Sequence, residues 1–249
     1  MTEFATYPSL RGQVAFVSGG ATGLGAEFVT QLAAQGVRVG FVDIQDEAGN
    51  ALAQKVDGLY QHCDVRDVEI LQAAIAATGE QLGPVTVLVN NAANDQRQPV
   101  ETLSAGEWDE FMEINLRHHF FATQAVVPMM REAGRGSVVN LGSISAHIDL
   151  MDLPVYITAK AGIEGLTRTL ARELGPDGIR VNCVMPGWVM TERQLEHWIN
   201  PEAEASIQRN QCLPQKLYPA DVARLVLWLA AEDSRSCTAQ RWIVDAGWM

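Results

Sequence analysis

Short apolar runs alternate with longer helix-patterned segments along most of this chain of 249 residues. The apolar runs predict strands at Val14–Ser18, Val37–Asp43, Leu59–Cys63, Val85–Asn90, Ser137–Gly142, Arg180–Met185 and Arg241–Val244. The longer segments predict helices at Gly23–Gln35, Asp46–Lys55, Val68–Gln81, Ala105–Ala133, Pro154–Leu174 and Pro219–Ala231. This alternation is typical of an α/β fold with a parallel sheet that helices cover on both faces, so we expect a doubly wound sheet.

One stretch, from Thr191 to Leu217, shows neither pattern and follows Pro186-Gly187. Long loops of this kind in compact proteins are often functional, so we expect a substrate lid at 191–217 rather than more sheet. The chain contains no internal repeat, low-complexity linker or abrupt shift in composition. Residues 1–249 are therefore predicted to form a single domain.

Composition and charge exclude several classes of protein. The chain is 47% hydrophobic and 19% charged, which is ordinary for a globular protein. Its net charge of -12 argues against nucleic-acid binding, which requires a basic surface. No apolar run reaches the ~20 residues of a membrane span, and Met1–Arg11 shows no signal-peptide pattern. We expect a cytoplasmic protein with no nucleic-acid partner and no membrane partner.

The cysteines and histidines indicate neither disulfides nor a metal site. The four cysteines lie far apart, so we expect reduced thiols, with Cys63 and Cys183 in the core. The five histidines show no paired ligand spacing such as His-x-x-x-His, so we expect no metal.

A glycine-rich turn follows the first expected strand. Gly19, Gly23 and Gly25 permit a tight turn, close approach of a pyrophosphate to the backbone, and close helix–strand packing. The start of the next helix adds free N–H groups and the positive end of the helix dipole. The alternative is a strand–helix turn without a ligand. We interpret the segment as the dinucleotide-binding turn of a Rossmann-type domain.

The second expected strand ends in Asp43, where a carboxylate can accept hydrogen bonds from the adenosine ribose hydroxyls. A carboxylate there also repels a 2′-phosphate, and Thr22, Ile44 and Gln45 offer no compensating cation. We therefore expect NAD in preference to NADP. The alternative is that Asp43 only caps the following helix.

Two further strand ends belong to the same expected crevice. Asp64 and Val65 follow the third strand, where they can hold an adenine ring, and Asn90–Ala93 follows the fourth with small residues for a ribose. Either segment could be only a turn, because Asp and Asn commonly end strands. Their shared position at the carboxyl ends of parallel strands favours ligand binding.

Tyr156 and Lys160 lie four residues apart, which places them on one face of a helix. An ammonium beside a phenol favours the phenolate and lowers its pKa from about 10 toward neutral pH. Tyr156 is therefore a candidate general base, with the Ser143 hydroxyl orienting a substrate oxygen. A Tyr-x-x-x-Lys pair alone is unspecific, and its place downstream of a nucleotide-binding turn is what gives it weight.

Over nearly its whole length the chain resembles the short-chain dehydrogenase/reductase family. The matching motifs occur in the family's order: the turn at 18–25, Asp64, Asn90–Ala92, Asn115, Ser143, Tyr156 with Lys160, and Pro186-Gly187. The resemblance implies a seven-stranded Rossmann-type sheet, a nicotinamide cofactor, a homotetramer and a catalytic tetrad of Asn115, Ser143, Tyr156 and Lys160. Ser18 and Ala93 stand where Thr and Gly are usual, and neither change touches the expected chemistry.

The same resemblance implies where the cofactor binds. The residues expected to contact NAD are Gly19, Thr22, Gly23, Leu24, Gly25, Asp43, Ile44, Asp64, Val65, Asn91, Ala92, Tyr156, Lys160, Pro186, Gly187, Val189 and Thr191. In this scheme Lys160 also binds the nicotinamide ribose, and Asn115 holds a water that links Lys160 to solvent. The alternative for Asn115 is a satisfied polar residue inside a kinked helix.

Segments 90–95, 114–118, 142–147 and 245–248 further resemble bacterial D-xylose 1-dehydrogenases and related aldose 1-dehydrogenases. This implies oxidation of the anomeric hydroxyl of a D-xylose-like pentose or related hexose to the lactone. Because sugar recognition needs directional polar groups, the expected substrate contacts are Asn94, Asp95, Ser143, His147, Tyr156, Trp188 and Gln194. Those not in the tetrad could equally be ordinary loop residues or caps. The alternative functions are a 3-oxoacyl or ketone reductase, a polyol dehydrogenase, and a catalytically idle NAD-binding protein.

Overall fold

The computed structural model describes residues 5–249, and in that range seven strands form one parallel sheet. The strands are β1 (Val14–Ser18), β2 (Arg38–Asp43), β3 (Leu59–His62), β4 (Val85–Asn90), β5 (Gly136–Leu141), β6 (Ile179–Pro186) and β7 (Arg241–Val244). Their order is β3-β2-β1-β4-β5-β6-β7, so the direction of winding reverses between β1 and β4. Such a reversal is the point at which open α/β sheets bind ligands. The predicted doubly wound sheet is confirmed.

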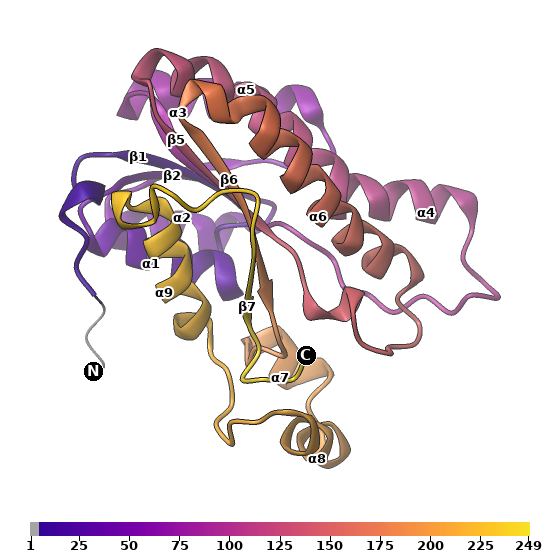
Figure 1. Ribbon diagram of the computed structural model, residues 1–249. Helices are drawn as coiled ribbons and strands as arrows, with labels where there is room; N and C mark the ends of the chain where they lie inside the picture. The colour runs from indigo at the N-terminus through magenta and orange to yellow at the C-terminus, as the bar shows by residue number, and fades with distance from the viewer. Residues whose placement is uncertain (1–4) are drawn as a thin grey trace.

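Helices cover both faces of this sheet (Figure 1). One face carries α1 (Gly23–Ala34), α2 (Asp46–Val56) and α9 (Pro219–Ala230), and the other carries α3 (Val68–Leu82), α5 (His118–Ala133) and α6 (Pro154–Leu174). Each face has its own buried apolar cluster, which includes Phe28 on the first face and Leu88 on the second. Because the central strands are covered on both sides, they read as continuous apolar runs.

The helix predicted over Ala105–Ala133 is interrupted at its centre. It consists of α4 (Ala105–Met112), a π-helical turn at Glu113–Arg117, and α5. The π-helical turn widens the helix by one residue and buries Asn115 completely. The prediction of one regular helix was wrong there, because an apolar pattern does not register a single inserted residue.

The lid segment, defined as residues 191–217, contains more regular structure than its sequence predicts. It forms α7 (Glu192–His197) and α8 (Pro201–Asn210), which begin at the capping side chains of Thr191 and Asn200. Both helices lie beyond the carboxyl end of β6 (Figure 1). They are short and mostly polar, so they carry little apolar periodicity.

Short 3-10 turns occupy Pro8–Leu10, Ile144–Ala146, Gly175–Asp177 and Glu232–Ser234.

The cysteines in the described range are all free thiols, and Cys63 and Cys183 are buried as predicted. None of the helices within residues 5–249 combines the length and apolar character that a membrane span requires.

Candidate active site

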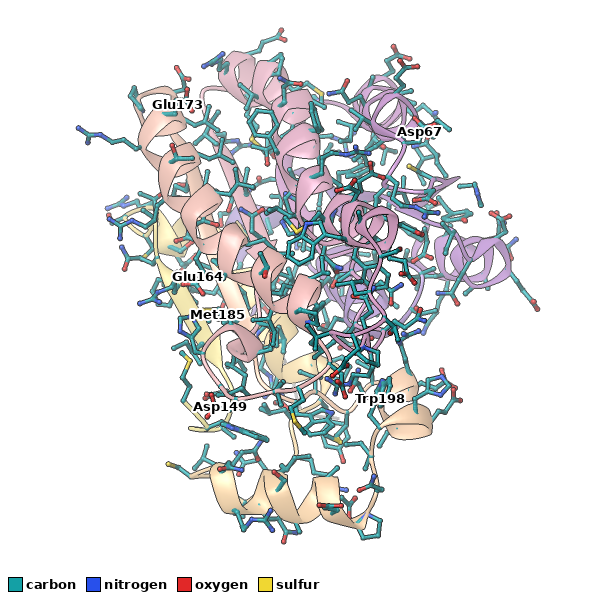
Figure 2. All side chains as sticks on the ribbon, turned by 90° about the vertical axis from the view of Figure 1, so that its right-hand side faces the viewer. Asp67, Asp149, Glu164, Glu173, Met185 and Trp198 are labelled. Carbon is teal, nitrogen blue, oxygen red and sulfur yellow. The ribbon has the colours of Figure 1, made fainter. Side chains whose placement is uncertain are left out.

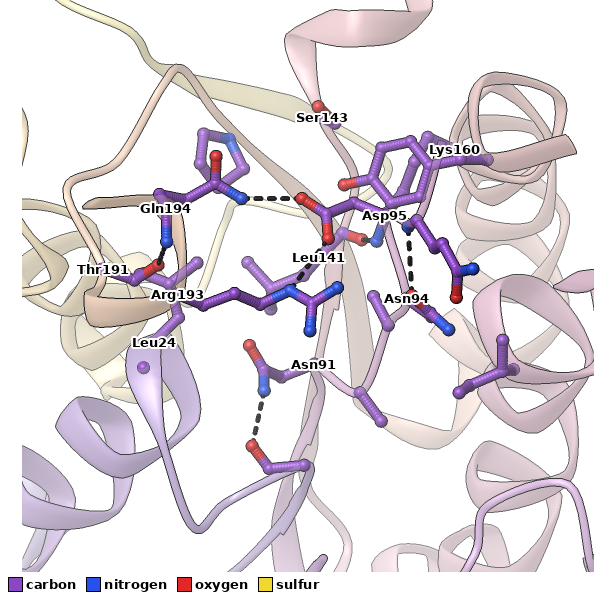
Figure 3. Close-up of a pocket in the computed structure, with 18 of the residues that line it drawn as sticks. Leu24, Asn91, Asn94, Asp95, Leu141, Ser143, Lys160, Thr191, Arg193 and Gln194 are labelled. Carbon is purple, nitrogen blue, oxygen red and sulfur yellow. Dashed lines mark hydrogen bonds and ion pairs between the residues drawn. The ribbon is translucent and has the colours of Figure 1, made fainter. Parts of the chain in front are cut away.

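A cavity of about 800 Å³ opens at the carboxyl ends of the central strands. Its wall is formed by the turn after β1, the ends of β2 to β6, and the start of the lid segment (Figure 3). Of the residues expected to contact the cofactor, Gly25 alone is not part of the lining. The volume lies within the usual range of small-molecule sites. Folding therefore gathers the predicted residues around one space.

The turn after β1 leaves its backbone open to a ligand. Gly19 and Gly23 have positive φ values of +64° and +57°, which disfavour any side chain. A Cβ on Gly19 would lie 2.8 Å from the Cα of Ala92, and one on Gly25 would lie 1.8 Å from the Gly19 carbonyl oxygen. Asn91 donates from Nδ2 to that same carbonyl at 2.8 Å, so the end of β4 braces the turn. This tight cradle fits a pyrophosphate held by backbone N–H groups.

Asp43 lies at the end of β2, 8% exposed, and its carboxylate lines the cavity. One oxygen accepts from the Ala21 N–H at 3.0 Å and the other from the Gln45 N–H at 3.1 Å. Each carboxylate oxygen keeps a second lone pair, which can accept a ribose hydroxyl. The nearby Gln45 amide donates to the Thr22 hydroxyl, so neutral groups surround the carboxylate on this side. The residues present therefore fit an unphosphorylated adenosine ribose.

Asp64 is engaged by a residue that the sequence did not suggest. Its carboxylate pairs with Arg66 at 2.5 Å, and the hydrogen bonds from Arg66 lower the pKa of Asp64. The guanidinium of Arg66 also pairs with Glu110 of α4 and lines the cavity. An adenine amino group that binds Asp64 would share the carboxylate with this ion pair.

Ser143, Tyr156 and Lys160 line the same cavity from the end of β5 and the first two turns of α6. Lys160 is buried and donates from Nζ to the Leu141 carbonyl at 2.7 Å. Its ammonium lies over the ring of Tyr156, 5.4 Å from the centroid. Tyr156 and Lys160 are thus neighbours at the crevice, as their spacing predicts.

The electrostatics of Tyr156 differ from the prediction that Lys160 lowers its pKa. Burial raises the pKa of Tyr156 above its usual 10.0, and the negative charge of Asp95 raises it further. A hydrogen bond with Ser143 and the positive charge of Arg97 lower the pKa, but the pKa of Tyr156 stays above 10.0. Burial also lowers the pKa of Lys160 to about 8. The sequence-based direction was wrong because it counted the nearby ammonium and not the loss of solvent.

Asn115 is fully buried in the π-helical turn and does not line the cavity. Its Oδ1 accepts from the Asn94 N–H at 2.9 Å, and its Nδ2 donates to the Asn94 carbonyl at 3.1 Å. Both polar ends of the amide therefore hold the backbone of the 94–98 loop, whose residues do reach the cavity. This contact matches the satisfied-residue alternative, and it positions the loop beside Tyr156.

Three predicted substrate contacts in the cavity lining form a chain of hydrogen bonds, of which Figure 3 shows the bond between Gln194 and Asp95. Trp188 donates to the Gln194 side-chain oxygen at 2.9 Å, and the Gln194 amide donates to Asp95 at 2.6 Å. Arg193 of the lid segment donates to the other oxygen of Asp95 at 3.2 Å. Asn94 also lines the cavity, through its position in the tethered loop. A carboxylate, two amides and an indole are therefore presented at one place.

His147 is the predicted substrate contact that the structure places elsewhere. Its Nε2 lies 2.6 Å from Glu164, which also pairs with Arg241 at 3.0 Å, and it is absent from the cavity lining. Glu164 lies midway along α6, well away from Trp198 of the lid segment (Figure 2). Although His147 is close to Ser143 in sequence, it follows the 3-10 turn at 144–146 and bonds Glu164 of α6.

Other lining or neighbouring residues were not among the predicted substrate or cofactor contacts. Trp248, next to the C-terminus, lines the cavity with its ring 6.4 Å from that of Trp188. Arg97 lines the cavity and lies over the ring of Trp198 at 5.0 Å. Each pair joins residues from separate elements, so only folding reveals it.

The histidines supply no metal ligand set. Over the described range no group of three or more His, Cys, Asp or Glu side chains could hold a metal ion. His118 and His119 are buried side by side and do not line the cavity, and burial lowers the pKa of His118 to about 3.

Comparisons with known proteins agree with this geometry. Residues 19–249 match the family described as Enoyl-(Acyl carrier protein) reductase. The chain is 49% identical to D-xylose 1-dehydrogenase of Caulobacter vibrioides, covering 98% of each chain. It is 46% identical to a probable galactose dehydrogenase of Rhizobium meliloti, covering 97% of this chain and 96% of the other. A solved structure of a putative gluconate dehydrogenase from Agrobacterium tumefaciens superimposes with a TM-score of 0.92 at 27% identity, covering 98% of both chains. On this evidence the chain belongs to the short-chain dehydrogenase/reductase family of oxidoreductases, whose dehydrogenases use nicotinamide cofactors.

Proposed function

We propose that this protein is an NAD-dependent dehydrogenase that oxidises the anomeric hydroxyl of an aldose, a D-xylose-like pentose or related hexose, to the lactone. The observation that carries the proposal is the convergence of Ser143, Tyr156 and Lys160 with the polar group at Asp95 on one cavity beside a dinucleotide cradle. The two relatives named above support it, because both are named for the oxidation of an aldose.

The preference for NAD rests on Asp43. Its carboxylate is fixed by two backbone N–H groups at the end of β2 and is suited to accept ribose hydroxyls. A 2′-phosphate would place negative charge against this carboxylate, and the nearby side chains of Thr22 and Gln45 are neutral. The glycine turn and the start of α1 would hold the pyrophosphate, and Lys160 would hold the nicotinamide ribose.

The chain's own residues then perform the proton transfer. Ser143 donates to the reacting oxygen and holds it beside the phenol of Tyr156. Tyr156, as the phenolate, accepts the proton of the anomeric hydroxyl and becomes a neutral phenol, and the ammonium of Lys160 over the ring stabilises the phenolate before the transfer. The nicotinamide, when bound, supplies the hydride acceptor. Asn115 contributes indirectly, because it fixes the loop that carries Asn94 and Asp95.

We assign recognition of the sugar to the hydrogen-bonded side chains of Asp95, Gln194 and Trp188 in the cavity lining. Asp95 and Gln194 can exchange their mutual bond for bonds to neighbouring sugar hydroxyls, and a substrate that lacks those hydroxyls would leave them unpaired. Trp188 and Trp248 offer apolar ring faces to the sugar's C–H groups. The lid segment that carries Gln194 would close over the bound substrate.

Reduction of NAD, measured by absorbance with a panel of pentoses, hexoses, polyols and secondary alcohols, tests the proposal. We expect turnover of an aldose to exceed that of every other class. Turnover of ketones or 3-oxoacyl compounds with silence toward all aldoses would refute it. Tyr156→Phe should abolish turnover while cofactor binding persists, and loss of both would point to a folding defect.

We further propose a cytoplasmic homotetramer. The family resemblance implies a homotetramer, and Trp108 of α4 and Phe120 of α5 are large apolar side chains left 38% and 40% exposed, which suits burial against another copy of the chain. Light scattering should give a mass of four chains. A monomer at working concentration would refute the assembly and leave the chemistry untouched.

A further inference from the structure

The chain ends in a short C-terminal tail, residues 245–249, which follows β7 and bends back on itself. Asp245 is 6% exposed, and each of its side-chain oxygens accepts one backbone N–H of the tail, from Gly247 at 2.7 Å and from Met249 at 2.8 Å. Between these bonds two successive residues have positive φ, Ala246 at +57° and Gly247 at +80°. A left-handed conformation is unfavourable for alanine, so the bonds to Asp245 are what holds this bend.

The tail is fixed to the surrounding structure at two places. It packs against Gly187 of the cavity lining so closely that a Cβ there would lie 2.8 Å from the Cα of Asp245. Two successive backbone carbonyls of the tail also accept the N–H groups of Leu213 at 3.0 Å and Cys212 at 3.2 Å, near the end of the lid segment. The bend therefore determines how the tail meets both the end of β6 and the lid segment.

The tail carries Trp248 to the substrate side of the cavity. The indole is partly buried against the apolar cluster that contains Ile144, the neighbour of Ser143 in sequence. Its ring lies 6.4 Å from that of Trp188, and both indoles line the cavity. Asp245 does not line the cavity, so it can act on a bound sugar only through the tail.

We propose that Asp245 is a positioning residue for the aldose, which holds the bend of the tail and thereby keeps the Trp248 indole in the wall of the substrate site. An indole can pack on the C–H face of a sugar only where its ring plane is fixed, because this contact is directional. Within the described residues the tail makes no hydrogen bond to the glycine turn or to Tyr156, so cofactor binding and the chemical step do not depend on it. This inference rests on the proposed oxidation of an aldose.

Substitutions at the two positions separate the anchor from the indole. Asp245→Ala removes both acceptors, whereas Asp245→Asn keeps one acceptor oxygen and should retain one of the two bonds. Trp248→Ala removes the indole and leaves the bonds of Asp245 in place, and Trp248→Phe keeps an aromatic ring. Asp233→Ala is a matched control, because Asp233 is exposed in the 3-10 turn at Glu232–Ser234 and does not line the cavity.

Initial rates at saturating NAD give kcat and the KM for the aldose, and calorimetric titration gives the Kd for NAD. We expect Asp245→Ala and Trp248→Ala each to raise this KM about tenfold, with kcat within about twofold and the Kd for NAD unchanged, because a binding contact and not a catalytic one is lost. Asp245→Asn should raise the KM less, and Trp248→Phe and Asp233→Ala should stay near the wild type. Adding Asp245→Ala to Trp248→Ala should raise the KM no further, since the indole that Asp245 positions is already absent.

A second readout is fluorine NMR of protein labelled with fluorotryptophan, in which Trp248→Phe assigns the Trp248 signal. Asp245→Ala should move this signal in the protein without sugar and abolish its response to the aldose. Should Asp245→Ala fail to fold, Asp245→Asn in the same assays decides.

Three results would overturn the inference: a KM of Asp245→Ala within about twofold of the wild type, a parallel rise in the Kd for NAD, or a further rise of the KM in the Trp248→Ala background. A wild type that turns over no aldose would instead overturn the proposed function. The fluorine signal without sugar still reports whether Asp245 positions Trp248 in that case, so the two failures are distinct.

Discussion

Replacing Asp43 by Ala tests how the end of β2 selects the cofactor. The carboxylate does two things at once in this structure. It ties the glycine turn to β2 through the N–H groups of Ala21 and Gln45, and it presents its free lone pairs to the cavity. The variant removes both functions and also the negative charge that would repel a 2′-phosphate.

The geometry sets the size of each effect. The two backbone bonds end on a charged acceptor that is 8% exposed, and losing them should cost about 3 kcal/mol of folding free energy. Loss of the ribose hydrogen bonds should weaken NAD binding by ~1.5–3 kcal/mol, which is about 10- to 100-fold in Kd. NADP loses less, because its phosphate no longer meets a carboxylate, so the ratio of the two affinities should approach one.

Calorimetric titration with NAD and with NADP gives the affinity ratio, and thermal denaturation gives the stability. Asp46→Ala is the matched control, because Asp46 is exposed, starts α2 and bonds Tyr60 and His62 outside the cavity. It should leave the NAD to NADP ratio unchanged. The reasoning is refuted if the wild type already binds NADP as tightly as NAD, or if Asp43→Ala leaves the ratio within about twofold of the wild-type value.

Three further predictions follow from burial and close contacts. Burial lowers the pKa of Lys160 from 10.5 to about 8. Between pH 8 and 10.5 the amine is therefore protonated in the unfolded chain and neutral in the folded one, so the free energy of unfolding of the wild type rises with pH across this window. Relative to Lys160→Met, chemical denaturation should show the wild type gaining up to about 3 kcal/mol across that window, and no pH-dependent difference would contradict this. Gly25→Ala forces a Cβ within 1.8 Å of the Gly19 carbonyl oxygen, so NAD binding measured by fluorescence should fall at least about tenfold; unchanged affinity would show that the turn adjusts freely. His147→Gln should keep kcat/KM within about twofold, because the imidazole bonds Glu164 outside the cavity, and a large loss would return His147 to the site.

Local patterns carried much of the fold and of the site. The doubly wound parallel sheet was predictable from the alternation of buried runs and helices, because a strand–helix–strand unit has few ways to close. The cofactor cradle was predictable since Gly19, Gly23 and Gly25 act within one turn. Tyr156 and Lys160 were predictable as neighbours because helical geometry fixes residues four apart.

Features that depend on distant residues were not predictable. Asp95 meets Arg193 and Gln194 from the other side of the cavity, and a single sequence does not show which loops face each other. The π-helical turn around Asn115 depends on the same kind of tertiary contact, since the amide bonds Asn94. Individual residues of the site could be predicted from the sequence, but the hydrogen bonds among them could not be predicted.

The difference between what the sequence predicts and what the folded structure shows matters most for function at Tyr156, in the pKa of its phenol. The spacing of Tyr156 and Lys160 alone predicts a phenol with a lowered pKa, whereas burial in the folded chain raises that pKa. The same burial keeps water from the phenol, so the charges of Asp95 and Arg97 act on it with less screening than in bulk solvent. Asp95 is already bonded to Arg193 and Gln194 in this structure, and the pKa of Tyr156 is still raised, so these contacts alone do not ionise the phenol. The activity of the enzyme should therefore rise with pH until the phenol of Tyr156 is ionised, because the fraction of phenolate limits proton transfer.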